Sequence, residues 1–133
     1  MLRALFTLEA LVDLAFGLAL IAVPGTLLSI YGMSTDRDGA FLARFLGATL
    51  IGFGAICWFA RPWADSEQRR LLIRALFVTS ALGFIVCLSY QLQPGAPLPA
   101  VVFVGLTMLF SLAWAYFTYR TFRFTPGRHD EPR

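Results

Sequence analysis

The sequence contains no lysine, a single histidine and two cysteines, and charged residues account for only 14% of its 133 positions. Hydrophobic residues account for 58%. Soluble domains average roughly 45–50% apolar and about 25% charged residues. The shortage of charge therefore excludes an ordinary soluble domain and indicates a protein whose solvent is lipid.

Residue sets that carry common enzyme chemistry are also missing. The only histidine, His129, lies near the C-terminus, so one chain cannot build a histidine-based metal site or a bis-histidine haem site. Cys57 and Cys87 are expected near opposite ends of two spans, which is too far apart for a disulfide. We therefore interpret both cysteines as small buried residues. There is no glycine-rich phosphate loop and no Ser-His-Asp or Cys-His set. We therefore predict a protein without enzymatic activity, metal or cofactor.

Long uncharged runs are what the sequence does contain. No charged residue occurs between Arg74 and Arg120, a run far longer than the roughly 20 residues that cross a bilayer core. The segment PGAPLP, residues 94–99, divides this run because proline and glycine end helices. The first half divides in the same way at residues 24–39. We predict an all-α, integral membrane four-helix bundle built of two helical hairpins. Its helices are expected at about 4–23, 41–60, 72–92 and 99–120.

The arginines predict the orientation, because basic residues accumulate in short cytoplasmic loops. In the four-span arrangement most of the 11 arginines fall on the side of the two termini, and only Arg37 and Arg44 lie near the other side. We expect a multi-pass protein of the bacterial cytoplasmic (inner) membrane with both termini in the cytoplasm. Residues 1–123 form the membrane domain, and residues 124–133 are expected to be a mobile cytoplasmic tail. The accumulation of arginines on the cytoplasmic side explains the net charge of +3 without a nucleic-acid partner.

A short repeat links the two predicted hairpins. The segment RALF occurs at residues 3–6 and again at 74–77, and a Pro-Gly pair follows each of the two helices at a similar distance. Because both hairpins run from inside to outside and back, such a repeat would be parallel. Four-residue matches also arise by chance in a sequence rich in Ala, Leu and Phe, so duplication and coincidence both stay open.

Small and polar residues form one stripe on each predicted span. Helices in a bilayer associate through close packing of small residues and through hydrogen bonds, so we expect the stripes to face the bundle interior. Such stripes serve packing more often than transport. They are Glu9, Asp13 and Gly17; Arg44, Ala48, Gly52 and Ala55; Thr79 or Ser80, Gly83, Cys87 and Tyr90; and Thr107, Ser111, Ala115 and Thr118.

Glu9 and Asp13 place two carboxyl groups one turn apart inside an apolar helix. With a rise of about 1.5 Å per residue, Asp13 is expected near the membrane midplane. Arg44 enters from the opposite side and is expected about 10 Å away along the normal, too far for a direct pair. Intramembrane acids are costly and therefore candidates for function. One hypothesis is that Asp13 binds a proton or a cation, with Glu9 leading to the cytoplasm.

The alternative hypothesis gives both carboxyl groups a structural role. Arg74 is expected near enough to the inner surface to pair with Glu9. A protonated Asp13 would donate a hydrogen bond to Ser80 or Ser111, which lie at the same depth, and would fix the register of the helices.

Aromatic residues are abundant, at 15% of the chain. Several are expected toward the inner interface, where amphipathic rings anchor helices at headgroup level. Phenylalanine-lined helices that hold a lipophilic ligand or quinone are the alternative. The expected anchors are Trp58, Trp63, Trp114, Tyr116 and Tyr119.

The second span, ARFLGATLIGFGAICWFAR at residues 43–61, and the four-span layout resemble the broad group of small bacterial DoxX-like membrane proteins. The resemblance implies a four-helix fold and, for some members, a role beside membrane redox enzymes. No site residue is carried over from it.

Three functions stay open. The leading hypothesis is a non-enzymatic accessory or interaction subunit that meets a larger membrane protein or further copies of itself in the lipid bilayer. The second is a small oligomeric transporter or channel that couples protons or cations through Asp13 and Glu9. The third is a quinone or lipid binder beside a membrane redox enzyme.

Overall fold

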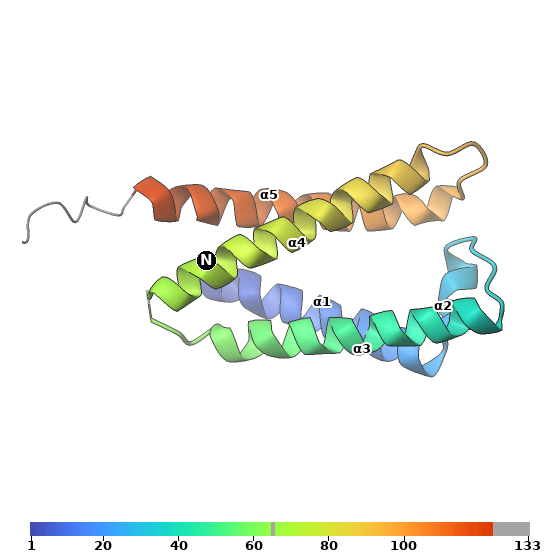
Figure 1. Cartoon of the computed structure of the whole chain (residues 1–133), viewed down its shortest axis with the longest axis horizontal. Helices are drawn as coiled ribbons and strands as arrows, with labels where there is room; N and C mark the ends of the chain where they lie inside the picture. Colours follow the sequence, from blue (N-terminus) through green and yellow to red (C-terminus); the bar gives the residue numbers. More distant parts are fainter. Residues whose placement is uncertain (65, 124–133) are drawn as a thin grey trace, which may run out of the picture.

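The computed structural model describes residues 1–64 and 66–123 of the chain (Figure 1). These residues are almost entirely helical and include no strand. Four helices are long and apolar enough to cross a membrane, which confirms the predicted all-α bundle of four spans. The elements are α1 (Leu2–Ala22), α2 (Pro24–Ile30), α3 (Arg37–Ala60), α4 (Glu67–Gln91), the 3-10 turn η1 (Leu98–Ala100) and α5 (Val101–Arg123).

Two helices begin several residues before the predicted boundaries of 41 and 72. The Asp36 carboxylate caps α3 by accepting a hydrogen bond of 2.7 Å from the backbone N–H of the residue three positions on. The Ser66 hydroxyl caps α4 in the same way at 3.3 Å. Such caps satisfy backbone donors that have no partner within the helix. Both first turns are polar, so the apolar pattern alone misses them.

The short helix α2 stands where the sequence predicted a loop. Pro24 begins it, because the first helical position needs no backbone N–H and proline already has a helical φ. The chain leaves α2 through Gly32, whose φ of +74° lies in the left-handed region that glycine adopts most readily. This turn directs the chain back toward the start of α3.

The spans pair as two hairpins, α1 along α3 and α4 along α5 (Figure 1). The α1–α3 pair is so close that a Cβ added to Gly17 would lie 2.7 Å from the carbonyl oxygen of Gly47. A Cβ added to Gly47 would lie equally close to the carbonyl oxygen of Gly17. Small residues therefore let the two backbones touch, as helix association in lipid requires.

The stripe predicted for the second span is wrong. Ala48 and Gly52 are exposed, and a Cβ added to Gly52 would meet nothing within 4 Å. Small residues occur on two faces of this helix, and contact with Gly17 of α1 decides which face is buried. The buried residues of α3 are Ala43, Gly47, Gly54, Cys57 and Ala60.

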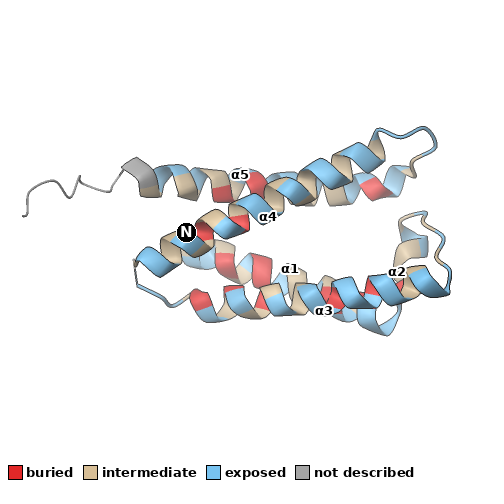
Figure 2. Ribbon diagram, viewed as in Figure 1, coloured by how far each residue is buried: buried red, intermediate tan, exposed pale blue. Residues whose placement is uncertain are grey.

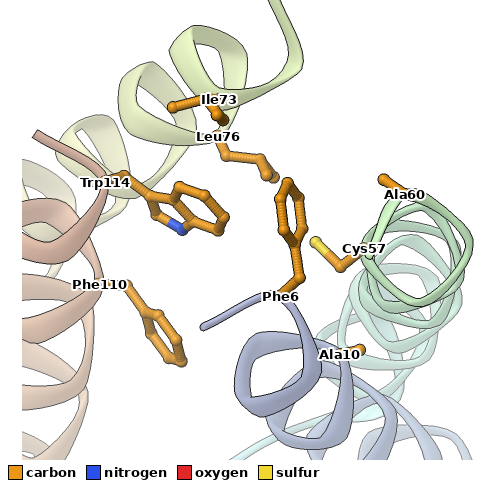
Figure 3. Packing of buried hydrophobic residues seen from close by; sticks show 8 residues of the cluster. All are labelled: Phe6, Ala10, Cys57, Ala60, Ile73, Leu76, Phe110 and Trp114. Atoms are coloured by element: carbon orange, nitrogen blue, oxygen red, sulfur yellow. The ribbon is translucent and has the colours of Figure 1, made fainter. Parts of the chain in front are cut away.

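The two hairpins meet in an apolar cluster at the end of the bundle that holds the N-terminus and the α3–α4 connection, here called the inner end (Figures 2 and 3). The outward faces of the helices are exposed and carry many large apolar residues, as expected of surfaces that lipid covers (Figure 2). The core cluster comprises Phe6, Ala10, Cys57, Ala60, Ile73, Leu76, Phe110 and Trp114.

A second meeting point lies at the opposite end, the outer end, which holds α2 and the α4–α5 connection. The rings of Tyr31 and Phe103 lie 4.4 Å apart between centroids. Gly32 also approaches Pro97, since a Cβ on that glycine would lie 2.6 Å from the proline Cβ. The hairpins are therefore in contact at both ends.

Candidate functional site

An apolar cleft opens between the two hairpins, beyond the core cluster. Its volume is about 340 Å³, at the lower end of the range of roughly 300–1,000 Å³ typical of small-molecule sites. A smaller pocket of about 250 Å³ shares Met33, Cys87 and Phe103 with it. All five α-helices contribute to the cleft, whose walls are Val12, Asp13, Phe16, Leu20, Leu27, Leu28, Met33, Leu46, Leu50, Cys87, Phe103 and Leu106.

Asp13 is the only charged residue among the described residues that line this cleft. It lies near the middle of α1, half-buried, and its Cβ is in close packing with Gly54 of α3. Across residues 1–64 and 66–123, no hydrogen bond or ion pair reaches its carboxyl group. The cleft therefore combines an apolar wall with one carboxyl group whose hydrogen-bonding capacity is available to a ligand.

The two serines predicted at the level of Asp13 do not satisfy it in the part of the chain that the structure describes. The Ser111 hydroxyl donates instead to the backbone carbonyl of Thr107 on its own helix, at 2.7 Å. Ser80 is half-buried on α4 and forms no hydrogen bond with Asp13. Hydroxyl groups in helices bond readily to the preceding turn, and this local bond competes with contacts between helices.

Glu9 has a partner that the sequence did not point to. Its side chain is 7% exposed, and its carboxylate accepts a hydrogen bond from the indole N–H of Trp114. Trp114 is fully buried and its ring lies edge-on to Phe6, with centroids 4.9 Å apart (Figure 3). The prediction that Trp114 anchors α5 at the headgroups is therefore wrong. The bond could have been anticipated from one fact: a carboxyl group inside an apolar core requires a hydrogen-bond donor, and Trp114 carries one.

Neither Arg44 nor Arg74 is among the described residues that line the cleft. Arg44 is exposed on α3, and its Nε donates to the backbone carbonyl of Ile21 at 3.4 Å, close to the end of α1 where carbonyls lack helical partners. Arg74 is half-buried on α4 at the inner end, next to Ile73 of the core cluster. Neither arginine therefore contributes a positive charge to the described walls of the cleft.

Two aromatic rings, those of Phe16 and Phe103, line the cleft, and a third, that of Tyr31, packs against Phe103. Phe103 of α5 lies 5.8 Å from Phe16 of α1 and 4.4 Å from Tyr31, which follows α2. We expected the tryptophans and tyrosines at the inner interface, with a phenylalanine-lined ligand site as the alternative, and the sequence did not indicate which phenylalanines would form such a site. Only the crossing of the hairpins brings residues so far apart in sequence together.

Both cysteines are free thiols. Cys57 is fully buried in the core cluster, and Cys87 is half-buried in the wall of the cleft. Within the described residues there is no group of three side chains suited to hold a metal ion.

The fold and the length of its helices define an all-α protein of the multi-pass membrane class. Comparison with protein-family models, with curated proteins and with solved structures finds no match to this chain. The resemblance to DoxX-like proteins stays a prediction, as does the internal repeat. The predicted tail, residues 124–133, lies outside the described residues.

Proposed function

We propose that this protein binds a lipophilic small molecule inside the membrane, in the cleft between its two hairpins. The observation that carries the proposal is Asp13, a carboxyl group that has no partner among the described residues and lines an otherwise apolar cleft. An unpartnered polar group in apolar surroundings costs free energy, and a ligand that bonds to it recovers that cost. Apolar walls with a few polar groups are also the usual composition of small-molecule sites.

The setting of this proposal is the cytoplasmic membrane of a bacterium, with both termini in the cytoplasm. The arginines support it: Arg61, Arg69 and Arg70 lie in or beside the α3–α4 connection at the inner end. The cleft then opens in the half of the bilayer farther from the cytoplasm. The resemblance to DoxX-like proteins, some of which act beside membrane redox enzymes, favours a membrane-soluble compound over a water-soluble one.

An accessory role is the second candidate, and the exposed small residues of α3 favour it. Ala48 and Gly52 face outward on a helix whose opposite side is already packed against α1. In lipid such a surface allows a neighbouring helix to approach closely. A subunit of this kind would meet a larger membrane protein or another copy of itself through α3 while the cleft holds its ligand.

The test is purification of the tagged protein from its own membranes in a mild detergent, followed by mass spectrometry of the retained small molecules and proteins. Leu28→Trp narrows the cleft, whereas Ile30→Trp adds the same side chain at a residue of α2 that is 64% exposed. We expect the wild type and Ile30→Trp to retain the same lipophilic compound and Leu28→Trp to lose it.

Two results decide between the candidates. Retained lipids that match the bulk membrane extract in all three proteins would overturn the ligand-binding proposal. A stoichiometric protein partner that is lost in Gly52→Leu would support the accessory role.

A further inference from the structure

The described walls of the cleft carry an acidic side chain and no basic one. Asp13 is the acidic residue of these walls, and Glu9 lies one turn away on α1. Glu9 is already bonded to Trp114, so Asp13 is the carboxyl group that faces an occupant. A neutral occupant leaves an ionised Asp13 without a counter-charge, whereas a cationic occupant supplies a charge and a contact at once.

The aromatic side chains of the cleft are also placed for a cation. Phe16 follows Asp13 by three residues, a spacing that puts both side chains on one face of α1. Phe103 packs beside Phe16 from the other hairpin. The faces of aromatic rings attract positive groups, most strongly where water is excluded. One carboxyl group and two neighbouring aromatic rings therefore line the same cleft.

We propose that the molecule bound in the cleft is a lipophilic cation, with its positive group at Asp13 and its apolar body along the leucine-lined walls. This inference rests on the proposed function and names the ligand class for the same site. A cleft of about 340 Å³ suits one compact amphiphile of drug-like size. The apolar body provides most of the contact, and the charge provides the selectivity.

A matched pair of probes tests the charge without changing the shape. The first is naphthylmethyl-trimethylammonium, and the second is its neutral isostere, in which carbon replaces the nitrogen. Binding of each is measured by equilibrium dialysis against the full-length protein in lipid nanodiscs, with protein-free nanodiscs as the blank. We expect the cation to bind the wild type at least about tenfold more tightly than the isostere, the size of one charge-assisted contact.

Two variants test whether the preference for the cationic probe depends on Asp13. Asp13→Asn keeps the size and hydrogen-bonding capacity of the side chain and removes its charge, and it is expected to abolish the preference for the cation. Asp38→Asn makes the same change at an exposed position at the start of α3 and is expected to leave the preference intact.

A measurement on the wild type alone tests the inference even if the Asp13→Asn variant does not fold. Cys87 lines the cleft, so saturating cation is expected to slow its alkylation by N-ethylmaleimide, and an equal concentration of isostere is expected to slow it less. Alkylation at the same rate with either probe would count against the inference.

The remaining outcomes separate the two proposals. If both probes bind equally and Leu28→Trp weakens both, the cleft binds lipophilic molecules but the preference for a cation is wrong. If the preference survives in Asp13→Asn, the positive group does not sit at Asp13 and the inference fails. If neither probe binds above the blank, the inference of a cation site fails, and the mass spectrometry of retained compounds decides the ligand-binding proposal separately.

Discussion

Glu9 and Trp114 hold α1 and α5 in register through a hydrogen bond inside the apolar core. An intramembrane carboxylate is expensive on its own, and a buried indole N–H also needs an acceptor. Each side chain thus resolves the problem that the other creates. Because α1 belongs to one hairpin and α5 to the other, this bond also joins the two halves of the bundle at their inner end.

Removing the indole donor of Trp114 is expected to destabilise the fold more than removing the charge of Glu9. Trp114→Phe leaves the carboxyl group of Glu9 buried without a partner and should lower the free energy of unfolding by about 1–3 kcal/mol. Glu9→Gln should have a smaller effect, because the amide oxygen still accepts from the indole. Unfolding in mixed micelles with increasing dodecyl sulfate, followed by circular dichroism, measures both. Equal losses in the two variants would show that the bond contributes little.

The two cysteines are expected to differ in reactivity. Cys87 borders the cleft and is half-buried, whereas Cys57 is fully buried in the core cluster. N-ethylmaleimide should therefore modify the Cys57→Ser variant, which retains Cys87, and should leave the Cys87→Ser variant unmodified over the same period. Intact-protein mass spectrometry of each single-cysteine protein gives the answer. Rapid modification of Cys57 would mean that the inner end opens.

At the scale of elements, the α1–α3 contact depends on backbone proximity. Gly17 and Gly47 face each other so closely that neither tolerates a side chain without movement of the helices. Such proximity increases the van der Waals contact area, which is a main source of helix association in lipid. The glycine on the opposite face of α3, Gly52, has no such neighbour.

Two alanine substitutions test whether Gly17 and Gly52 differ in their contribution to stability. In Gly17→Ala the new methyl group would lie 2.7 Å from both the Gly47 oxygen and a side-chain carbon of Ile51, so the free energy of unfolding should fall by about 1–3 kcal/mol. Gly52→Ala should be neutral or raise stability by up to about 1 kcal/mol, because alanine favours helix and the space is open. The same micelle titration compares them, and a loss in Gly52→Ala equal to that in Gly17→Ala would contradict the predicted interface.

At the scale of the whole molecule, the hairpins meet at two ends and leave the cleft between them. The core cluster joins them at the inner end, and the contacts of Tyr31 and Gly32 with the second hairpin join them at the outer end. Beside the cleft, Asp13 of α1 packs against Gly54 of α3, within the first hairpin. A ligand in the cleft therefore lies against side chains that also join the two hairpins, above all Phe103.

The orientation in the membrane can be tested with two matched cysteines on a background with Cys57→Ser and Cys87→Ser. Gln68→Cys lies exposed at the start of α4 at the inner end, and Gln93→Cys lies exposed in the α4–α5 connection at the outer end. From the arginine distribution we expect a membrane-impermeant maleimide to label Gln93→Cys in intact spheroplasts, and Gln68→Cys only after permeabilisation. The reverse pattern would place both termini outside.

The candidate site was only partly predictable. Asp13 stands out in the sequence because a carboxyl group in an apolar span is rare, and the structure places it in the wall of the cleft. Its expected serine partners bond elsewhere, and the ring of Phe103 was not expected there. Hydropathy gives the position of a residue along a helix but leaves the rotation of that helix open.

The sequence by itself determined the helical class and the four apolar spans, because a bilayer forces apolar segments of fixed length into helices. Only the tertiary structure decided that Gly17 meets Gly47, that Trp114 bonds to Glu9 and that the hairpins enclose a cleft beside Asp13. The physical reason is that lipid solvates every apolar face of a helix about equally well. Contacts between particular side chains, which the linear pattern does not contain, therefore choose how the helices turn toward one another.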